Sequence, residues 1–321
     1  MKKLLLLLVS ILNIFCTKTS EDYFSIGNEK YKEGKYNEAI QYYNKAIELN
    51  PNYAEAYYNR GIAKYKLGDY YGTIKDNNKA IELNPSYVDA YNIRGVVKDY
   101  LGDYYSAIND YSKAIELNPN YAEAYYNRGV AKYNYGNYYG AIKDNNKAIE
   151  LNPNLAEAYN NRGNAKNELK DYNGAMEDYN KAIELNPDRA ETYYNRGNIK
   201  CILGDYYGAI NDYSKAIELN PNYSEAYNNR GFSKNQLRDY SGAMKDYNKA
   251  IELNSNYGVA YMTRGYLKII LGDKKGGYLD LKKAGEMGIE EAYEVIKNIA
   301  SNKKNNYFNS DIMFIRPKKH N

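Results

Sequence analysis

The sequence predicts an all-α protein in which antiparallel helix pairs, one in every 34 residues, stack into a solenoid. Asn-Pro recurs at 50–51, 84–85, 118–119, 152–153, 186–187 and 220–221, always 34 residues apart. The segments between these points end in KAIELN, and most carry a Gly-Asp turn in the middle. Because proline excludes the helical conformation from the residue before it, each Asn-Pro ends a helix. Such a fixed period is typical of repeat architectures.

The period divides most of the chain into eight repeats, and the last boundary, Asn254–Ser255, has lost its proline. The repeats are 17–50, 51–84, 85–118, 119–152, 153–186, 187–220, 221–254 and a degenerate 255–288. Residues 289–300 (IEEAYEVIKNIA) read as an amphipathic capping helix, which a solenoid needs to cover its last apolar face. The tail 301–321 is basic and is expected to be disordered.

Four positions within the repeat carry a family resemblance. Counting Ala54 as position 1, position 4 is Tyr (Tyr57), position 8 is Gly in all eight copies, position 20 is small and position 27 is Ala. Small residues let two helices approach closely, and the aromatic ring fills the gap beside them. The pattern resembles the tetratricopeptide repeat (TPR) over about 17–288. The resemblance implies a right-handed superhelical solenoid that binds a protein, as a peptide or a helix, in a concave groove lined by the first helices.

An arginine stands at position 7, where the TPR family usually has leucine. Position 23 holds an aspartate in the same repeats, and the first repeat has neither, with Ile26 and Tyr42 instead. A buried guanidinium needs a partner. We therefore predict one ion pair within each repeat: Arg60–Asp76, Arg94–Asp110, Arg128–Asp144, Arg162–Asp178, Arg196–Asp212, Arg230–Asp246 and Arg264–Asp280. A pair that reaches a neighbouring repeat and a groove that binds anions are the alternatives.

The groove itself is expected to be rich in amides and aromatic rings. The candidate residues are Asn59, Asn127, Asn161, Asn195 and Asn229 at position 6, with Tyr58, Tyr126 and Tyr194 at position 5. An amide offers a donor and an acceptor, which suits the backbone of an extended peptide. The structural alternative is that these asparagines bond their own scaffold. Tyrosine faces and amides also suit sugars, so a glycan-binding protein is the second functional candidate.

Composition argues against several other functions. Residues 17–300 lack the basic excess that nucleic-acid binding requires, because the positive charge is concentrated at the two ends. The chain has two cysteines, Cys16 and Cys201, and one histidine, His320, so a zinc site or a histidine-based triad is not expected. No phosphate loop or nucleophile elbow is present. We therefore expect no enzyme activity and no cofactor.

The N-terminus reads as a targeting segment. Two lysines precede an apolar run from Leu4 to Leu12, which predicts a signal peptide over 1–16 and hence an exported protein. Cys16 resembles the acylated cysteine of bacterial lipoproteins, although Asn13 and Phe15 depart from that signal. A membrane-anchored lipoprotein and a periplasmic protein cleaved by the ordinary signal peptidase are both consistent with this segment.

Overall fold

The computed structural model describes residues 18–300 of the 321. The predicted signal segment, the lipidation candidate Cys16 and the tail 301–321 therefore lie outside the described residues. Within the described range, 17 helices follow one another with no strand. The all-α fold is confirmed, and the helices divide between two compact units, residues 1–153 and 154–321.

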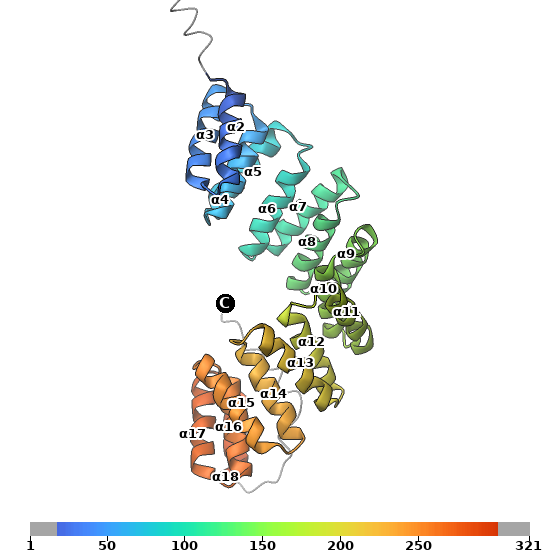
Figure 1. The fold of residues 1–321 in the computed structure, drawn as a ribbon, viewed down its shortest axis with the longest axis vertical. Coiled ribbons are helices and arrows are strands. Elements are labelled where there is room, and N and C mark those ends of the chain that lie inside the picture. Colours follow the sequence, from blue (N-terminus) through green and yellow to red (C-terminus); the bar gives the residue numbers. More distant parts are fainter. Residues whose placement is uncertain (1–17, 301–321) are drawn as a thin grey trace, which may run out of the picture. The chain divides into compact units, whose positions relative to one another are not determined.

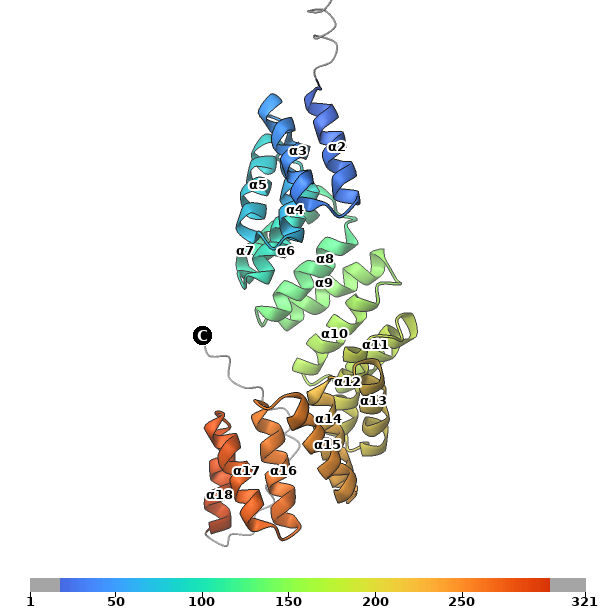
Figure 2. The ribbon, with the colours of Figure 1, turned by 60° about the vertical axis from the view of Figure 1, so that its left-hand side comes forward.

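The first unit contains four helix pairs, which Figures 1 and 2 show from two sides. The first helices are α2 (Ser20–Lys32), α4 (Ala54–Lys66), α6 (Val88–Tyr100) and α8 (Ala122–Asn134). The second helices are α3 (Tyr36–Leu49), α5 (Tyr70–Leu83), α7 (Tyr104–Leu117) and α9 (Tyr138–Leu151). Each first helix packs against its own second helix, and α2, α4 and α6 each also contact the first helix of the next pair. The first helices therefore form a continuous face.

The second unit repeats this arrangement and adds one helix at its end. Its first helices are α10 (Ala156–Glu168), α12 (Ala190–Ile202), α14 (Ser224–Gln236) and α16 (Gly258–Ile270). Its second helices are α11 (Tyr172–Leu185), α13 (Tyr206–Leu219), α15 (Tyr240–Leu253) and α17 (Lys274–Glu286). The last helix, α18 (Glu290–Ala300), packs against α17. Val295 and Ile289 join Val259 and Leu281 in one buried cluster, which is consistent with a capping helix.

Small residues set the distance between the two helices of a pair. The alanines at positions 20 and 27, such as Ala209 and Ala216, are fully buried. At position 8 a side chain has no room, because a Cβ added to Gly197 would lie 2.9 Å from the ring of Tyr213. The glycine is therefore required by the aromatic ring that packs over it from the second helix.

The turn within each pair explains the Gly-Asp dipeptide. Gly68 and Gly204 have φ of 80° and 81°, a left-handed conformation that ends the first helix. The next residue, for example Asp69, caps the second helix by accepting a hydrogen bond from the backbone of Gly72. Lys170 and Arg238 replace the glycine in two repeats, and both keep the left-handed conformation, with φ of 62° and 64°. These two turns are therefore strained.

This strain predicts that Arg238→Gly stabilises the chain. Glycine adopts a positive φ without a steric cost, and the gain should be roughly 0.5–1 kcal/mol after its extra entropy in the unfolded state is subtracted. The matched reciprocal change, Gly204→Arg, should destabilise by a similar amount. Urea unfolding followed by circular dichroism measures both midpoints. A fall in the midpoint for Arg238→Gly would contradict the assignment of strain.

Candidate functional site

Each position-7 arginine forms a bidentate ion pair with the aspartate of its own repeat. In the third pair of helices, Nε of Arg94 lies 2.9 Å from Oδ2 of Asp110, and Nη2 lies 2.6 Å from Oδ1. The same two hydrogen bonds recur in all seven repeats, at 2.5–2.9 Å. The structure thus brings together the residues of each predicted pair. Two parallel charge-assisted bonds fix the geometry as well as the charge.

Two further side chains complete each pair into a cluster. The lysine four residues after the arginine donates to the same aspartate, as Lys98 does to Asp110 at 2.8 Å. The guanidinium also lies over a ring of its own helix, with Cζ of Arg94 5.4 Å from the ring centroid of Tyr91. This cation–π contact recurs in all seven repeats at 5.2–5.7 Å. The position-4 tyrosine therefore has an electrostatic role beside its packing role.

The arginine also joins its repeat to the preceding one. Nη1 of Arg60 donates to Oδ1 of Asn44 at 2.7 Å, and Nη1 of Arg128 donates to Oγ of Ser112 at 3.0 Å. The same hydrogen bond, from Nη1 to the side chain 16 residues earlier in the chain, is formed by Arg94, Arg196, Arg230 and Arg264. In these six repeats Nε, Nη1 and Nη2 all donate to protein groups. This favours a structural role over the alternative of an anion-binding groove.

The aspartates of these clusters are nearly buried, and each lies beside an arginine and a lysine. The side chain of Asp76 is 3% exposed, while that of Arg60 is 16% exposed. Burial by itself would raise the pKa of Asp280, but the hydrogen bonds from Arg264 and Lys268 outweigh it and lower that pKa. The stability that this group contributes is therefore present above the ordinary aspartate pKa of about 3.9. It is lost as the pH falls toward the folded-state value.

The first repeat shows what replaces the cluster when both charges are absent. The ring of Tyr42 stacks near that of Tyr23, with 6.4 Å between their centroids. Nζ of Lys45 lies 5.4 Å from both ring centroids. Nζ of Lys18 also lies 5.8 Å from the ring centroid of Tyr23. In α2 and α3 an aromatic pair with two nearby lysines thus takes the place of the arginine cluster.

The position-6 asparagines are placed differently from the open groove that the sequence predicts. Nδ2 of Asn59 donates to Oδ1 of Asn28 at 2.8 Å, and Nδ2 of Asn195 donates to Oδ1 of Asn164 at 3.0 Å. Asn127 and Asn229 likewise donate to side chains of the preceding first helix, at 3.0–3.3 Å. These four amides therefore join neighbouring first helices, and each uses at least one amide donor within the scaffold.

The fifth asparagine of this row, Asn161, has no such tie. Its side chain is 7% exposed, and no described residue accepts a hydrogen bond from its Nδ2. Asn229 is only 1% exposed. Replacing Asn229 with alanine would consequently disturb the scaffold itself, because a buried amide would be removed together with its hydrogen bonds to Tyr194 and Asn198.

In three repeats, a tyrosine on the second helix donates a hydrogen bond to the same asparagine that accepts from the next first helix. Oη of Tyr213 donates to Oδ1 of Asn198 at 2.8 Å, and Nδ2 of Asn229 donates to the same oxygen at 3.0 Å. Tyr43 with Asn28, and Tyr179 with Asn164, form the same hydrogen bond. Sequence reasoning missed this arrangement. The available signal was that asparagine at position 9 always accompanies tyrosine at position 24 and asparagine at position 6 of the next repeat.

The three predicted groove tyrosines are half-buried and lie on the first-helix face. The ring centroid of Tyr58 is 4.8 Å from that of Tyr87, and the centroid of Tyr194 is 4.8 Å from that of Tyr223. Tyr126 occupies the equivalent place on α8. Each ring therefore presents only part of its surface to solvent at the start of a first helix.

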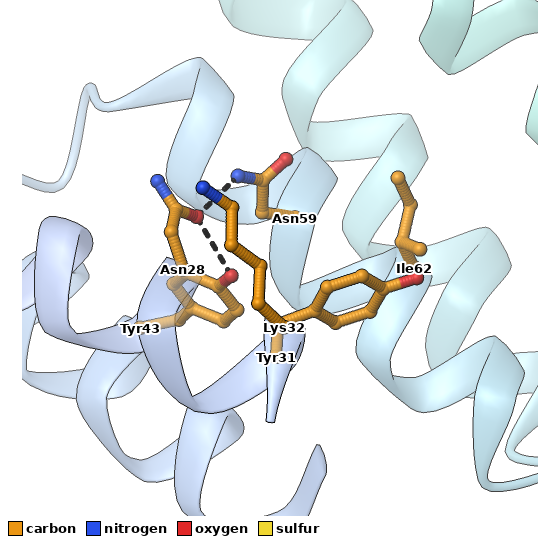
Figure 3. Close-up of a pocket in the computed structure, with 6 residues that line it drawn as sticks. All are labelled: Asn28, Tyr31, Lys32, Tyr43, Asn59 and Ile62. Carbon is orange, nitrogen blue, oxygen red and sulfur yellow. Dashed lines mark hydrogen bonds between the residues drawn. The ribbon is translucent and has the colours of Figure 1, made fainter. Parts of the chain in front are cut away.

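A pocket of about 330 Å³ opens between α2 and α4 in the first unit. Figure 3 shows the ring of Tyr31 extending toward Ile62, while the bonded amides of Asn28 and Asn59 lie at the other side. The exposed ammonium group of Lys32 lies near these amides (Figure 3). The lining residues are Asn28, Tyr31, Lys32, Tyr43, Asn59 and Ile62. The pocket thus combines an apolar wall with donor groups.

The described residues offer little for metal or thiol chemistry. No group of three or more His, Cys, Asp or Glu side chains within 18–300 is arranged to hold a metal ion. Cys201 is buried, and burial raises the pKa of its thiol to about 11, with Oγ of Ser233 3.7 Å from the sulfur. A thiol with such a pKa is almost entirely protonated near neutral pH. Within the same range, no helix is both long and apolar enough to cross a bilayer.

Comparison with known families agrees with the repeat architecture. A model described as TPR repeat matches residues 27–68, 100–136, 163–200 and 197–237, and one described as Tetratricopeptide repeat matches 54–87, 122–155 and 224–257. The chain belongs to the tetratricopeptide repeat family. The prediction made from the 34-residue period is therefore confirmed at the level of the family.

Solved TPR structures share this fold at low sequence identity. A tetratricopeptide repeat protein from Parabacteroides merdae is 21% identical, over 78% of this chain and 98% of its own, with a TM-score of 0.60. Pseudomonas aeruginosa pilF is 20% identical, over 66% of this chain and 97% of its own, with a TM-score of 0.60. MamA from Desulfovibrio magneticus RS-1 is 25% identical, over 53% and 96%, with a TM-score of 0.50. No curated protein sequence matches the chain.

The hydrogen bonds between position-24 tyrosines and position-9 asparagines predict different effects for two equivalent tyrosines. Tyr213→Phe removes a hydrogen bond to Asn198 and should destabilise by roughly 0.5–1.5 kcal/mol. Oη of Tyr247 is buried without a partner, since position 9 of that repeat is Phe232. Tyr247→Phe should therefore be neutral or stabilising. Urea midpoints compare the two variants, and equal destabilisation would contradict the assigned bonds.

The arginine cluster predicts coupling between Arg128 and Asp144. Arg128→Leu should destabilise by roughly 1–3 kcal/mol, because Asp144 loses two of its charge-assisted bonds and keeps only Lys132. Adding Asp144→Tyr gives this repeat an apolar and an aromatic residue at positions 7 and 23, as Ile26 and Tyr42 are in the first repeat. The double variant should recover part of the lost stability. Unfolding midpoints for both single variants and the double variant measure the coupling. Strict additivity would show that the two side chains do not interact.

Proposed function

We propose that this protein is a non-enzymatic interaction scaffold that binds an extended peptide or a helix along its first-helix face. The observation that carries the proposal is the continuous row of first helices in the first unit, with a pocket between α2 and α4. A pocket that combines an apolar wall with a few polar groups is the usual form of a recognition site. Membership of a family of scaffold repeats supports the same function.

The structure changes which residues of this face are the candidates for contact. Because Asn59 and Asn127 each donate to the preceding first helix, we expect ligand contact mainly from the surrounding side chains. In the first unit these are the pocket residues Tyr31, Lys32 and Ile62 and the half-buried ring of Tyr58. The bonded amides Asn28 and Asn59 join α2 to α4, the two helices that carry these side chains, and this preorganises the face for a partner.

We propose further that this scaffold works at the bacterial cell envelope. The apolar run that follows Lys2 and Lys3 supports export, and Cys16 is the candidate for lipid attachment. Thr19, the cap of α2, follows Cys16 by three residues. An acyl chain on Cys16 would therefore hold the first unit close to the membrane.

The pocket gives a direct test of the proposed function. Ile62→Arg places a long charged side chain in the pocket and should weaken partner binding at least tenfold, about 1.4 kcal/mol. Tyr71→Arg introduces the same residue at a position that is 78% exposed on α5 and should have no effect. Affinity capture from envelope extract, quantified by mass spectrometry, compares both variants with wild type at equal helical content. Equal capture by all three would place the ligand elsewhere.

A parallel capture from glycosidase-treated extract separates the two ligand classes. The proposal expects capture to survive the removal of glycans. Loss of capture after this treatment would favour a glycan ligand instead.

Lipid attachment is tested by metabolic labelling with a palmitate analogue. Wild-type protein should carry the label, and Cys16→Ser should carry none, because the thiol is the proposed acceptor. Cys201→Ser is the matched control and should label like wild type, since that cysteine is buried. Label that survives Cys16→Ser would refute the anchor.

A further inference from the structure

The first-helix face of the first unit carries negative charge that the fold does not compensate. The segment from the start of α4 to the end of α9, all of it described, contains ten Asp and Glu residues in its helices and two in its turns. Six form ion pairs with Lys or Arg, and Asp69 and Asp103 cap helices. The remaining four have no cationic partner within these helices, and all lie on first helices: Glu55, Asp89, Asp99 and Glu123.

Uncompensated cations in the same helices are distributed the other way. Lys75 and Lys143, on the second helices α5 and α9, have no acidic partner within α4 to α9. On the first helices of this segment, Lys66 is the one lysine without such a partner. Ion pairs thus compensate the charges between the two helices of a repeat. The unpaired charges are mainly negative on the first helices and positive on the second helices. Such a separation favours partners whose charge complements one face.

Tyrosine rings lie between these carboxylates. Glu55, Asp89 and Glu123 are exposed at position 2, and their charges act on the half-buried tyrosines Tyr58, Tyr87 and Tyr121. Oη of Tyr121 donates to Oδ1 of Asp89 at 3.3 Å, and the rings of Tyr58 and Tyr87 are 4.8 Å apart. Burial, followed by the charges of Glu123 and Asp89, raises the pKa of Tyr121. We call these six residues the acid–tyrosine strip.

We propose that the acid–tyrosine strip binds a peptide segment bearing lysine or arginine side chains. This inference rests on the proposed peptide-binding function and names the chemistry of the partner. A carboxylate beside a ring face offers a cation both an ion pair and a cation–π contact. The chain itself uses this combination, since each cluster arginine lies between an aspartate and a tyrosine ring, as Arg60 does with Asp76 and Tyr57.

The strip also has a structural role that its test must separate from binding. A carboxylate at the second position of a helix stabilises the helix N-terminus through the helix dipole. Amide substitutions at this position retain the shape and remove the charge, so a loss of binding must be compared with the change in stability.

The second unit offers a contrast within the same chain. There Arg189 replaces the tyrosine before α12, and its Nη2 lies 2.8 Å from Oε2 of Glu191. A carboxylate that already has a cation has less to gain from a ligand. We confine the proposal to the first unit, where the position-2 carboxylates of α4, α6 and α8 all lack a cationic partner within these helices.

The test is a selection of random peptides of about 12 residues on the full chain. The strip variant E55Q/D89N/E123Q is compared with wild type and with E82Q/E116Q/E150Q. The latter removes three carboxylates from the second-helix face and is matched in charge. Peptides enriched on wild type should be rich in Lys and Arg. Their affinity, measured by fluorescence anisotropy, should fall at least tenfold on the strip variant and less than twofold on the control variant.

Each other outcome overturns the inference in a distinguishable way. Enriched peptides that lack Lys and Arg, or that bind the strip variant normally, would refute it while leaving the proposed peptide-binding function intact. Equal weakening by both triple variants would show non-specific attraction to the net charge. A selection that enriches no peptide would refute both the inference and the proposed function. Thermal unfolding of both variants identifies any loss that arises from instability.

Discussion

The bidentate pair between each position-7 arginine and the aspartate 16 residues later is the interaction on which the repeats depend. It holds the two helices of a pair together, while the backward bond of the arginine holds that pair to the one before it. A buried ion pair adds little net stability compared with apolar packing, but it is costly to break from one side only. The pair therefore specifies how helices meet more than it contributes to stability.

Because the arginine clusters use their charges inside the repeat, other residues determine the charge of the surface. Because lysine and arginine compensate the aspartates of the second helices, the exposed charge of the first-helix face is set mainly by the acids at position 2. The amides at position 6 are also used internally, and they align successive first helices instead of facing a ligand. What remains open to a partner in the first unit is a row of carboxylates and ring faces with the pocket at its start.

Much of the fold can be predicted from the sequence, because the residues that form each contact recur in several copies. The helix pairs, the left-handed turn and the arginine–aspartate pairing all follow from residues that appear or vanish together, as Ile26 and Tyr42 show. The rotation of one first helix against the next does not follow from a period. For that reason the period alone does not show that Asn59 and Asn195 donate to Asn28 and Asn164 of the preceding first helix. The lysine that joins each aspartate, such as Lys98, was also missed, because lysine is common on any exposed helix.

The most direct test of the central claim is the solvent exchange of arginine Nε–H groups, measured by NMR on selectively labelled protein. The chain has ten arginines, of which seven form clusters. We predict seven dispersed Nε–H signals that exchange slowly, because each donates to a nearly buried aspartate. The exposed Arg238, without such a bond, should exchange rapidly. Exchange at the same fast rate for all ten arginines would contradict the account.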